Sequence, residues 1–220
     1  MFMKNFQDNE PLSSLTHLVG FFLSIAGLVL LITTAIRYST AWHLFSFAVF
    51  GASLILLYLA STVYHFIPKS NKLTDTFLRI DKSFIFFLIA GSYTPLVLVP
   101  LRGSWGWLIF GIVWGTAIAG IIFQIFKKKL NSWITLSLYL ALGWFMVLVL
   151  PYLAKTLSGP AIAWLIAGGL MYTIGAVFFA LDEKWPSRRL FGWHEVFHLF
   201  VLGGSLSHFW LMYHYITYLK

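Results

Sequence analysis

The sequence predicts an all-α, polytopic membrane protein with seven transmembrane helices in a single domain. Of its 220 residues, 60% are hydrophobic and only 10% are charged, whereas soluble domains carry roughly a quarter charged residues. The mean hydropathy is +0.84. Seven apolar stretches are long enough to cross a bilayer as helices, and the loops between them leave no room for a soluble domain. We therefore expect a polar N-terminal segment, residues 1–14, followed by one seven-helix domain, residues 15–218.

The seven spans are predicted from continuous apolar runs. The first follows a polar, mildly acidic segment and lacks a small-residue cleavage site, so we interpret it as a membrane span and not as a signal peptide. The third is the shortest. The seventh is longer than a bilayer requires and is expected to tilt. In order, the predicted spans are Leu15–Ile36, His43–Phe66, Ser83–Leu98, Trp105–Phe126, Trp133–Leu153, Pro160–Leu181 and Trp193–Tyr218.

The distribution of lysine and arginine predicts the orientation, because cytoplasmic loops carry an excess of these residues. The N-terminus and the loops after spans two, four and six hold eleven of them: Lys4, Lys69, Lys72, Arg79, Lys82, Lys127, Lys128, Lys129, Lys184, Arg188 and Arg189. The opposite side holds four: Arg37, Arg102, Lys155 and Lys220. The N-terminus is therefore predicted to be cytoplasmic and the C-terminus to lie outside.

Composition and topology exclude several classes of function. The formal charge of +8 comes from short loops between apolar runs, a pattern that favours anionic lipid headgroups over nucleic acid as the partner. The chain contains no cysteine, which excludes disulfides, thiolate metal ligands and cysteine nucleophiles. A cytoplasmic N-terminus is the reverse of the orientation of G-protein-coupled receptors. No signal in the sequence indicates an oligomeric state.

The segment His194-Glu-Val-Phe-His198 carries the main chemical signal. Histidines four residues apart lie on one face of a helix, which is the spacing by which one helix supplies two ligands to a transition metal. Ionisable side chains at membrane depth are costly and are therefore functional candidates. His65 at the inner end of span two, together with Ser61 one turn above it and Asp81 at the start of span three, is predicted to lie at the same depth.

Three neutral imidazoles with an open fourth position form the usual ligand set of a catalytic zinc ion, so we expect His65, His194 and His198 to bind Zn²⁺. Asp81 is then a candidate to accept a proton from water, and Ser61 a candidate hydrogen-bond donor. Taken singly, each residue also has an ordinary structural interpretation. His65 could be an interfacial residue, and Asp81 could form an ion pair with a neighbouring base. Ser61 could donate a hydrogen bond to a carbonyl group of its own helix.

Three further residues are candidates to line a cavity: His17, His208 and Tyr93. His17 begins span one on the inner side, where an interfacial role is the alternative. His208 follows His198 by ten residues and so lies roughly 15 Å further out, too far to share the same ion.

Four motifs resemble one known family. They are Ser61-Thr-Val-Tyr-His65, Arg79-Ile-Asp81, Ala90-Gly-Ser-Tyr-Thr-Pro95 and Phe191-Gly-Trp-His-Glu-Val-Phe-His198. In this order they are similar to the haemolysin III branch of the progestin and adipoQ receptor family, which is related to adiponectin receptors and alkaline ceramidases. The resemblance extends from about Glu10 to His208. It implies seven helices, a bacterial inner (plasma) membrane location, zinc near the inner leaflet with His65, His194 and His198 as ligands, and Asp81 and Ser61 beside them.

Two positions depart from the family pattern. Ser13 stands between Glu10 and His17 where family members often carry asparagine, which weakens any role assigned to Glu10. Lys82 follows Asp81 where many bacterial relatives have histidine, which indicates that position 82 is not an indispensable ligand.

These observations leave several functions open. The first is a zinc-dependent hydrolase of a lipid amide, as the resemblance to ceramidases implies, with a membrane lipid as substrate. The second is a non-enzymatic sensor or regulator of membrane state with a structural zinc, and cytolytic pore activity is a weaker alternative that the branch name suggests. The third is a protease that uses His194-Glu195-xx-His198. It is disfavoured because no acidic ligand follows and because Glu195 points about 100° away from His194 around the helix.

Overall fold

The computed structural model describes residues 10–126, 132–185 and 191–219. Within these ranges seven helices are long and apolar enough to span a membrane, and the predicted all-α architecture is confirmed. The predicted basic residues Lys4, Lys127–Lys129, Arg188, Arg189 and Lys220 lie outside the described ranges. The elements are α2 (Pro11–Tyr38), α3 (Ala41–Phe66), α4 (Thr74–Leu98), α5 (Ser104–Phe126), α6 (Ser132–Trp144), α7 (Met146–Leu153), α8 (Gly159–Lys184), α9 (Trp193–His214) and the short 3₁₀ helix η1 (Ile216–Tyr218).

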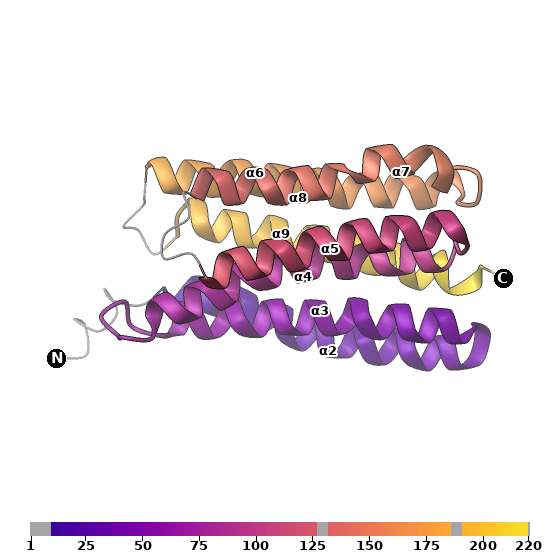
Figure 1. The fold of residues 1–220 in the computed structure, drawn as a ribbon. Coiled ribbons are helices and arrows are strands. Elements are labelled where there is room, and N and C mark those ends of the chain that lie inside the picture. The colour runs from indigo at the N-terminus through magenta and orange to yellow at the C-terminus, as the bar shows by residue number, and fades with distance from the viewer. Residues whose placement is uncertain (1–9, 127–131, 186–190, 220) are drawn as a thin grey trace.

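The helices form an up-and-down bundle in which most neighbours in sequence also pack side by side (Figure 1). α9 lies between α8 on one side and α2 on the other, so the first and last described spans are in contact. The described chain starts at one end of the bundle and finishes at the other, as an odd number of crossings requires. We call the end at which α2 begins the inner end, because the lysine and arginine distribution predicts that it faces the cytoplasm.

Several element boundaries differ from the predicted spans, and the three largest differences are at the start of α2, the start of α4 and the end of α9. α2 begins at Pro11, before the predicted Leu15, because proline is well suited to the first turn of a helix. α4 begins at Thr74, well before Ser83, because its first turns are polar and an apolar window misses them. Asp81 consequently lies inside α4, not at the start of the helix. The C-terminal end of the seventh span is irregular, since α9 ends at His214 and η1 follows.

The fifth span is interrupted at Phe145, between α6 and α7. The break leaves carbonyl groups near the end of α6 that need other donors. The Tyr93 hydroxyl donates to the carbonyl oxygens of Leu142 and Gly143, at 2.9 and 3.0 Å. Tyr93 thereby ties α4 to the interrupted span in the middle of the bundle.

The core lies mainly along α3 and α4, which are the most buried helices, whereas only 17% and 22% of the most apolar stretches of the fifth and sixth spans are buried. Close α3–α4 packing depends on small residues, as is common between membrane helices. A Cβ added at Gly91 would lie 2.3 Å from the Ser53 hydroxyl oxygen and 2.7 Å from the Ser53 Cβ. This contact fixes the helix that carries His65 against the helix that carries Asp81.

Candidate metal centre

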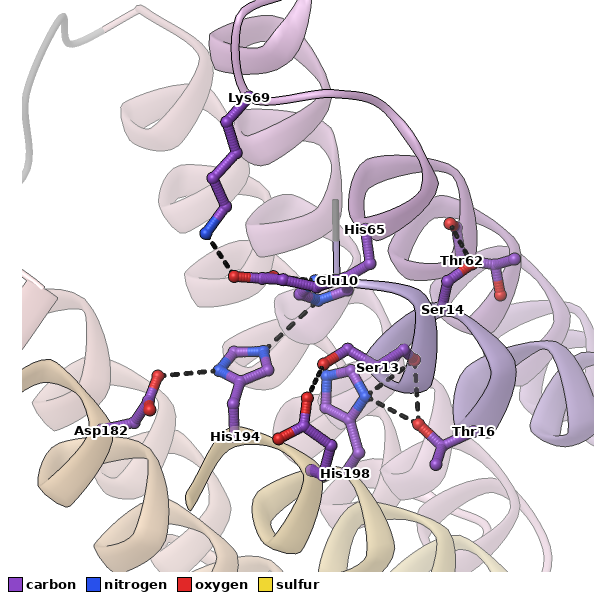
Figure 2. A network of polar contacts seen from close by, with 11 residues as sticks. Glu10, Ser13, Ser14, Thr16, Thr62, His65, Lys69, Asp182, His194 and His198 are labelled. Atoms are coloured by element: carbon purple, nitrogen blue, oxygen red, sulfur yellow. Dashed lines mark hydrogen bonds and ion pairs between the residues drawn. The ribbon is translucent and has the colours of Figure 1, made fainter. Parts of the chain in front are cut away.

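Three histidines from opposite ends of the sequence meet at the inner end of the bundle. His65 is in the last turn of α3, while His194 and His198 occupy the first two turns of α9. His65 and His198 are buried and His194 is half-buried. One nitrogen from each lies within 4.8 Å of the others. The three residues that the HxxxH spacing and the predicted depth singled out are therefore close enough to hold one metal ion (Figure 2).

Carboxylates accept hydrogen bonds from the Nδ1 atoms of two of these histidines. Glu10, the residue that precedes α2, places its Oε2 2.6 Å from His65 Nδ1. Asp182, in the last turn of α8, places its Oδ2 3.3 Å from His194 Nδ1. A carboxylate can only accept, so Nδ1 is the protonated nitrogen in each ring, and the lone pair of each Nε2 is free.

The third histidine is oriented by the main chain of α2. His198 Nδ1 lies 3.1 Å from the Ser13 carbonyl oxygen and 3.1 Å from the Thr16 hydroxyl oxygen. The Thr16 hydroxyl donates its own proton to the same Ser13 carbonyl, at 2.8 Å. Both oxygens are therefore acceptors toward the imidazole, and His198 also carries its proton on Nδ1 and keeps Nε2 free.

The spacing of two of the free nitrogens is compatible with a tetrahedral metal ion. His65 Nε2 and His194 Nε2 lie 3.3 Å apart. Because each ring carries its proton on Nδ1, the lone pairs of the two Nε2 atoms face one another and repel unless a cation lies between them. Two nitrogen ligands of tetrahedral zinc, each about 2.0–2.1 Å from the metal, are separated by roughly 3.3–3.4 Å. A carboxylate or carbonyl on the outer nitrogen is also the usual support of a metal-bound histidine. The residues present therefore fit a divalent transition metal held by three imidazoles.

Both carboxylate oxygens of Glu195 accept hydrogen bonds from groups other than the three histidines. Its Oε1 accepts a hydrogen bond from the Ser13 hydroxyl at 2.5 Å, and its Oε2 accepts one from the backbone N–H of Gly192 at 2.7 Å. The second contact caps the first turn of α9. Since both oxygens are engaged away from the histidines, the carboxylate is poorly placed to act as the base of a metalloprotease.

Glu10 also forms an ion pair with Lys69, beyond the end of α3. Burial by itself would raise the pKa of the Glu10 carboxyl, but hydrogen bonds from His65 and Lys69 and the positive charge of Lys69 outweigh burial and lower the pKa below its usual value. Glu10 is therefore ionised across the physiological range. The structure thus gives a role to a residue that the sequence pattern had led us to discount.

A cavity of about 450 Å³ extends from the three histidines toward the other end of the bundle. Asp81 and Ser61 line it near the histidines and lie within interacting distance of one another. His17, Tyr93 and His208 line it as well. Both His194 and His208 belong to its wall, so it runs roughly 21 Å along α9 at 1.5 Å per residue. Most of its lining is apolar, and the polar groups gather at the inner end.

His17 contacts one of the three histidines directly. Its ring stacks on that of His198, with centroids 3.5 Å apart and planes inclined by 10°. Neither of its ring nitrogens has a hydrogen-bond partner in the described chain. α2 therefore supplies the side chain, His17, against which the His198 ring packs.

Sequence reasoning did not find the oxygen partners of the histidines. Asp182 had a usable signal, because it ends span six on the side where span seven begins and so shares the depth of His194. Glu10 had the same signal at the start of span one, but the departure at Ser13 drew attention away from it. The contribution of the Ser13 carbonyl had no signal, because a main-chain atom is independent of side-chain type.

Comparisons with known proteins agree with this architecture. The family described as haemolysin-III related matches residues 6–209. The chain belongs to the haemolysin-III-related family. It is 41% identical over 216 residues to Hemolysin-3 of Bacillus cereus, covering 97% of this chain and 94% of the relative. It is 40% identical over 206 residues to the Hemolysin-3 homolog of Bacillus subtilis (strain 168), covering 94% and 93%.

The similarity extends beyond bacteria. The human monocyte to macrophage differentiation factor is 30% identical over 185 residues, which cover 80% of this chain and 70% of the human protein. The resemblance identified from the four motifs is thus confirmed at the level of the family. As a haemolysin-III-related protein with seven apolar helices, the chain is a multi-pass membrane protein.

Proposed function

We propose that this protein is a zinc-dependent hydrolase that cleaves the amide bond of a membrane lipid. The observation that carries the proposal is the convergence of three imidazoles, one nitrogen of each within 4.8 Å of the others, whose Nδ1 atoms are all engaged by acceptor oxygens so that the Nε2 lone pairs remain free. When bound there, zinc supplies Lewis-acid activation of water and of a carbonyl group. Thiolates are absent from the chain, and an all-imidazole set suits zinc among the common metals.

The cavity supports a lipid as the substrate. Its volume of about 450 Å³ lies within the roughly 300–1,000 Å³ of small-molecule sites. Its length of roughly 21 Å along α9 exceeds the roughly 15 Å of hydrocarbon in one leaflet. An acyl chain would occupy the apolar part, which places its carbonyl carbon at the polar inner end beside Asp81 and Ser61.

The residues of the chain suggest how the reaction proceeds. Water adds its oxygen to the amide carbonyl carbon, and the Asp81 carboxylate accepts the released proton. Asp81 then delivers that proton to the nitrogen as the C–N bond breaks, leaving a fatty acid and an amine. The Ser61 hydroxyl, next to Asp81, donates a hydrogen bond that orients this carboxylate or stabilises the developing negative charge. The choice of an amide rests on the resemblance to alkaline ceramidases.

The test uses purified protein in lipid nanodiscs with a ceramide and a matched ester of the same acyl chain. We expect fatty-acid release from the amide that is lost on chelation and restored by zinc. His194→Ala should abolish it, whereas His214→Ala, an exposed histidine at the other end of α9, should leave it unchanged. Asp81→Asn should retain zinc but lower turnover about 10²- to 10⁴-fold, the usual contribution of a general acid–base group. Turnover unaffected by chelation would refute the proposal, and preference for the ester would change the bond assigned.

A structural zinc in a non-enzymatic sensor of membrane state is the second candidate. It is favoured by the way in which the contacts of the three histidines connect α2, α3, α8 and α9. On this alternative, zinc raises the melting temperature of the protein and no defined lipid is hydrolysed. Equal melting temperatures with and without zinc would exclude it.

A further inference from the structure

We propose that the start of α2, with Glu10 directly before it, is a positioning element of the metal centre and acts through Glu10, Ser13 and Thr16. The inference rests on the metal site proposed above and concerns residues that do not themselves touch the ion. These residues set the proton position and the ring orientation of His65 and His198. Metal affinity is therefore determined in part by a helix that contributes no ligand.

The start of α2 is fixed to the end of the helix that carries His65. The backbone N–H of Glu10 donates to the His65 carbonyl oxygen at 3.2 Å, a carbonyl in the last turn of α3 that has no helical partner of its own. The Ser14 hydroxyl donates to the Thr62 carbonyl oxygen at 3.0 Å. Glu10 thus holds His65 by its main chain and, through the 2.6 Å contact with Nδ1, by its side chain.

The same turns are fixed to α9. The Ser13 hydroxyl donates to Glu195, which is adjacent in sequence to His194, and the Ser13 carbonyl accepts from His198 Nδ1. Thr16 adds a second acceptor at 3.1 Å from the same nitrogen. Figure 2 shows Glu10 next to His65, and Ser13 and Thr16 next to His198. α2 therefore determines the relative placement of ligands from two other helices.

The expected energetic consequence is substantial. Hydrogen-bond partners of metal-bound histidines typically contribute 10- to 100-fold in metal affinity. Two of the three proposed ligands obtain these partners from α2 and the residue before it. A carboxylate contributes more than a hydroxyl because charge-assisted hydrogen bonds are about twice as strong as neutral ones. Loss of Glu10 should therefore weaken metal binding more than loss of the Thr16 hydroxyl, beside which the Ser13 carbonyl remains.

The experiment measures cobalt binding by the full chain in nanodiscs, using chelator competition for affinity and the visible absorption of Co²⁺ for ligand geometry. Glu10→Gln replaces the carboxylate with an amide of the same shape, and Thr16→Val removes only the hydroxyl. Lys69→Met is the matched control, because it removes the other partner of Glu10 and leaves the His65 contact. Melting of the metal-free protein is measured for every variant.

We expect Glu10→Gln to bind Co²⁺ about 10- to 100-fold more weakly with an altered spectrum, and Thr16→Val to show a smaller loss. Glu10→Asp should recover part of the affinity, and Lys69→Met should differ from wild type by less than about fivefold, as expected for an exposed ion pair.

Wild-type affinity and spectrum in both Glu10→Gln and Thr16→Val would overturn the inference and leave the metal site standing. A lower melting temperature of the metal-free protein with unchanged affinity would also overturn it, by showing a purely structural role. A wild-type protein that binds no Co²⁺ would instead refute the metal site itself.

Discussion

Each histidine of the candidate metal centre has its Nδ1 atom next to an acceptor oxygen, which leaves Nε2 free to bind a metal ion. The acceptors differ in kind: a carboxylate before α2, a carboxylate at the end of α8 and a main-chain carbonyl in α2. All three produce the same tautomer, because none of them can donate. The chemistry of the site is therefore encoded as much in the residues behind the imidazoles as in the imidazoles themselves.

Asp182 provides a test of this principle on a different helix from α2. Asp182→Asn should weaken zinc or cobalt binding about tenfold, near the lower end of the usual range for such partners, because its contact with His194 Nδ1 is 3.3 Å long. Glu183→Gln is the control, since it removes an adjacent carboxylate of equal charge without removing the His194 contact. Chelator competition measures both. A larger loss in Glu183→Gln than in Asp182→Asn would show that overall charge, and not the hydrogen bond, governs affinity.

At the scale of helices, α3 and α4 bring His65, Ser61 and Asp81 to one place, and they do so by close packing. The Gly91 Cα faces Ser53, whose hydroxyl already donates to the Phe50 carbonyl oxygen at 2.6 Å. Rotating the hydroxyl away would not make room for a methyl group, because the Ser53 Cβ is also within 2.7 Å of the added atom. The helices themselves would have to separate.

Gly91→Ala should accordingly destabilise the protein by about 1–3 kcal/mol, the usual cost of overpacking. Gly111→Ala on α5 is the matched control. A Cβ there meets nothing within 4 Å, so the substitution should be neutral or stabilising by up to about 1 kcal/mol through helix propensity. Thermal unfolding in detergent would measure both variants. Equal stability of the two would show that α3 and α4 can separate freely at this point.

Much of this arrangement could be predicted from the sequence, and the limits have physical causes. Apolar length identified every span, but it missed the polar first turns of α4 because helices continue into the headgroup region. The predicted depth alone placed His65, His194 and His198 at the same end of the bundle, because the alternating direction of the spans fixes which helix ends share a side. Depth gives no information on the rotation of each helix about its axis. The pairing of Glu10 with His65 and of Asp182 with His194 could therefore not be predicted.

At the scale of the whole molecule, the contact between α2 and α9 closes the bundle, and the metal centre sits at the inner end of that contact. The orientation of the bundle decides which aqueous compartment would supply the metal ion and the water of the proposed reaction. The excess of lysine and arginine at the inner end predicts that this compartment is the cytoplasm.

The absence of cysteine from the chain makes this orientation simple to measure, because no native thiol competes with an introduced cysteine for a labelling reagent. Ser70, exposed at the inner end, and Ser158, exposed at the other end, are suitable positions. In intact cells, a membrane-impermeant maleimide should label Ser158→Cys and not Ser70→Cys, and permeabilisation should make both reactive. The opposite pattern would place the metal centre on the outer side.

The contact between Ser13 and Glu195 joins residues 182 apart in sequence. During synthesis, a chain that emerges N-terminus first has inserted six spans before Glu195 and His198 leave the ribosome. Loading of the proposed metal ion consequently waits until the last helix of the bundle has emerged, and translation products truncated before α9 should pass through the membrane insertion machinery without acquiring the ion.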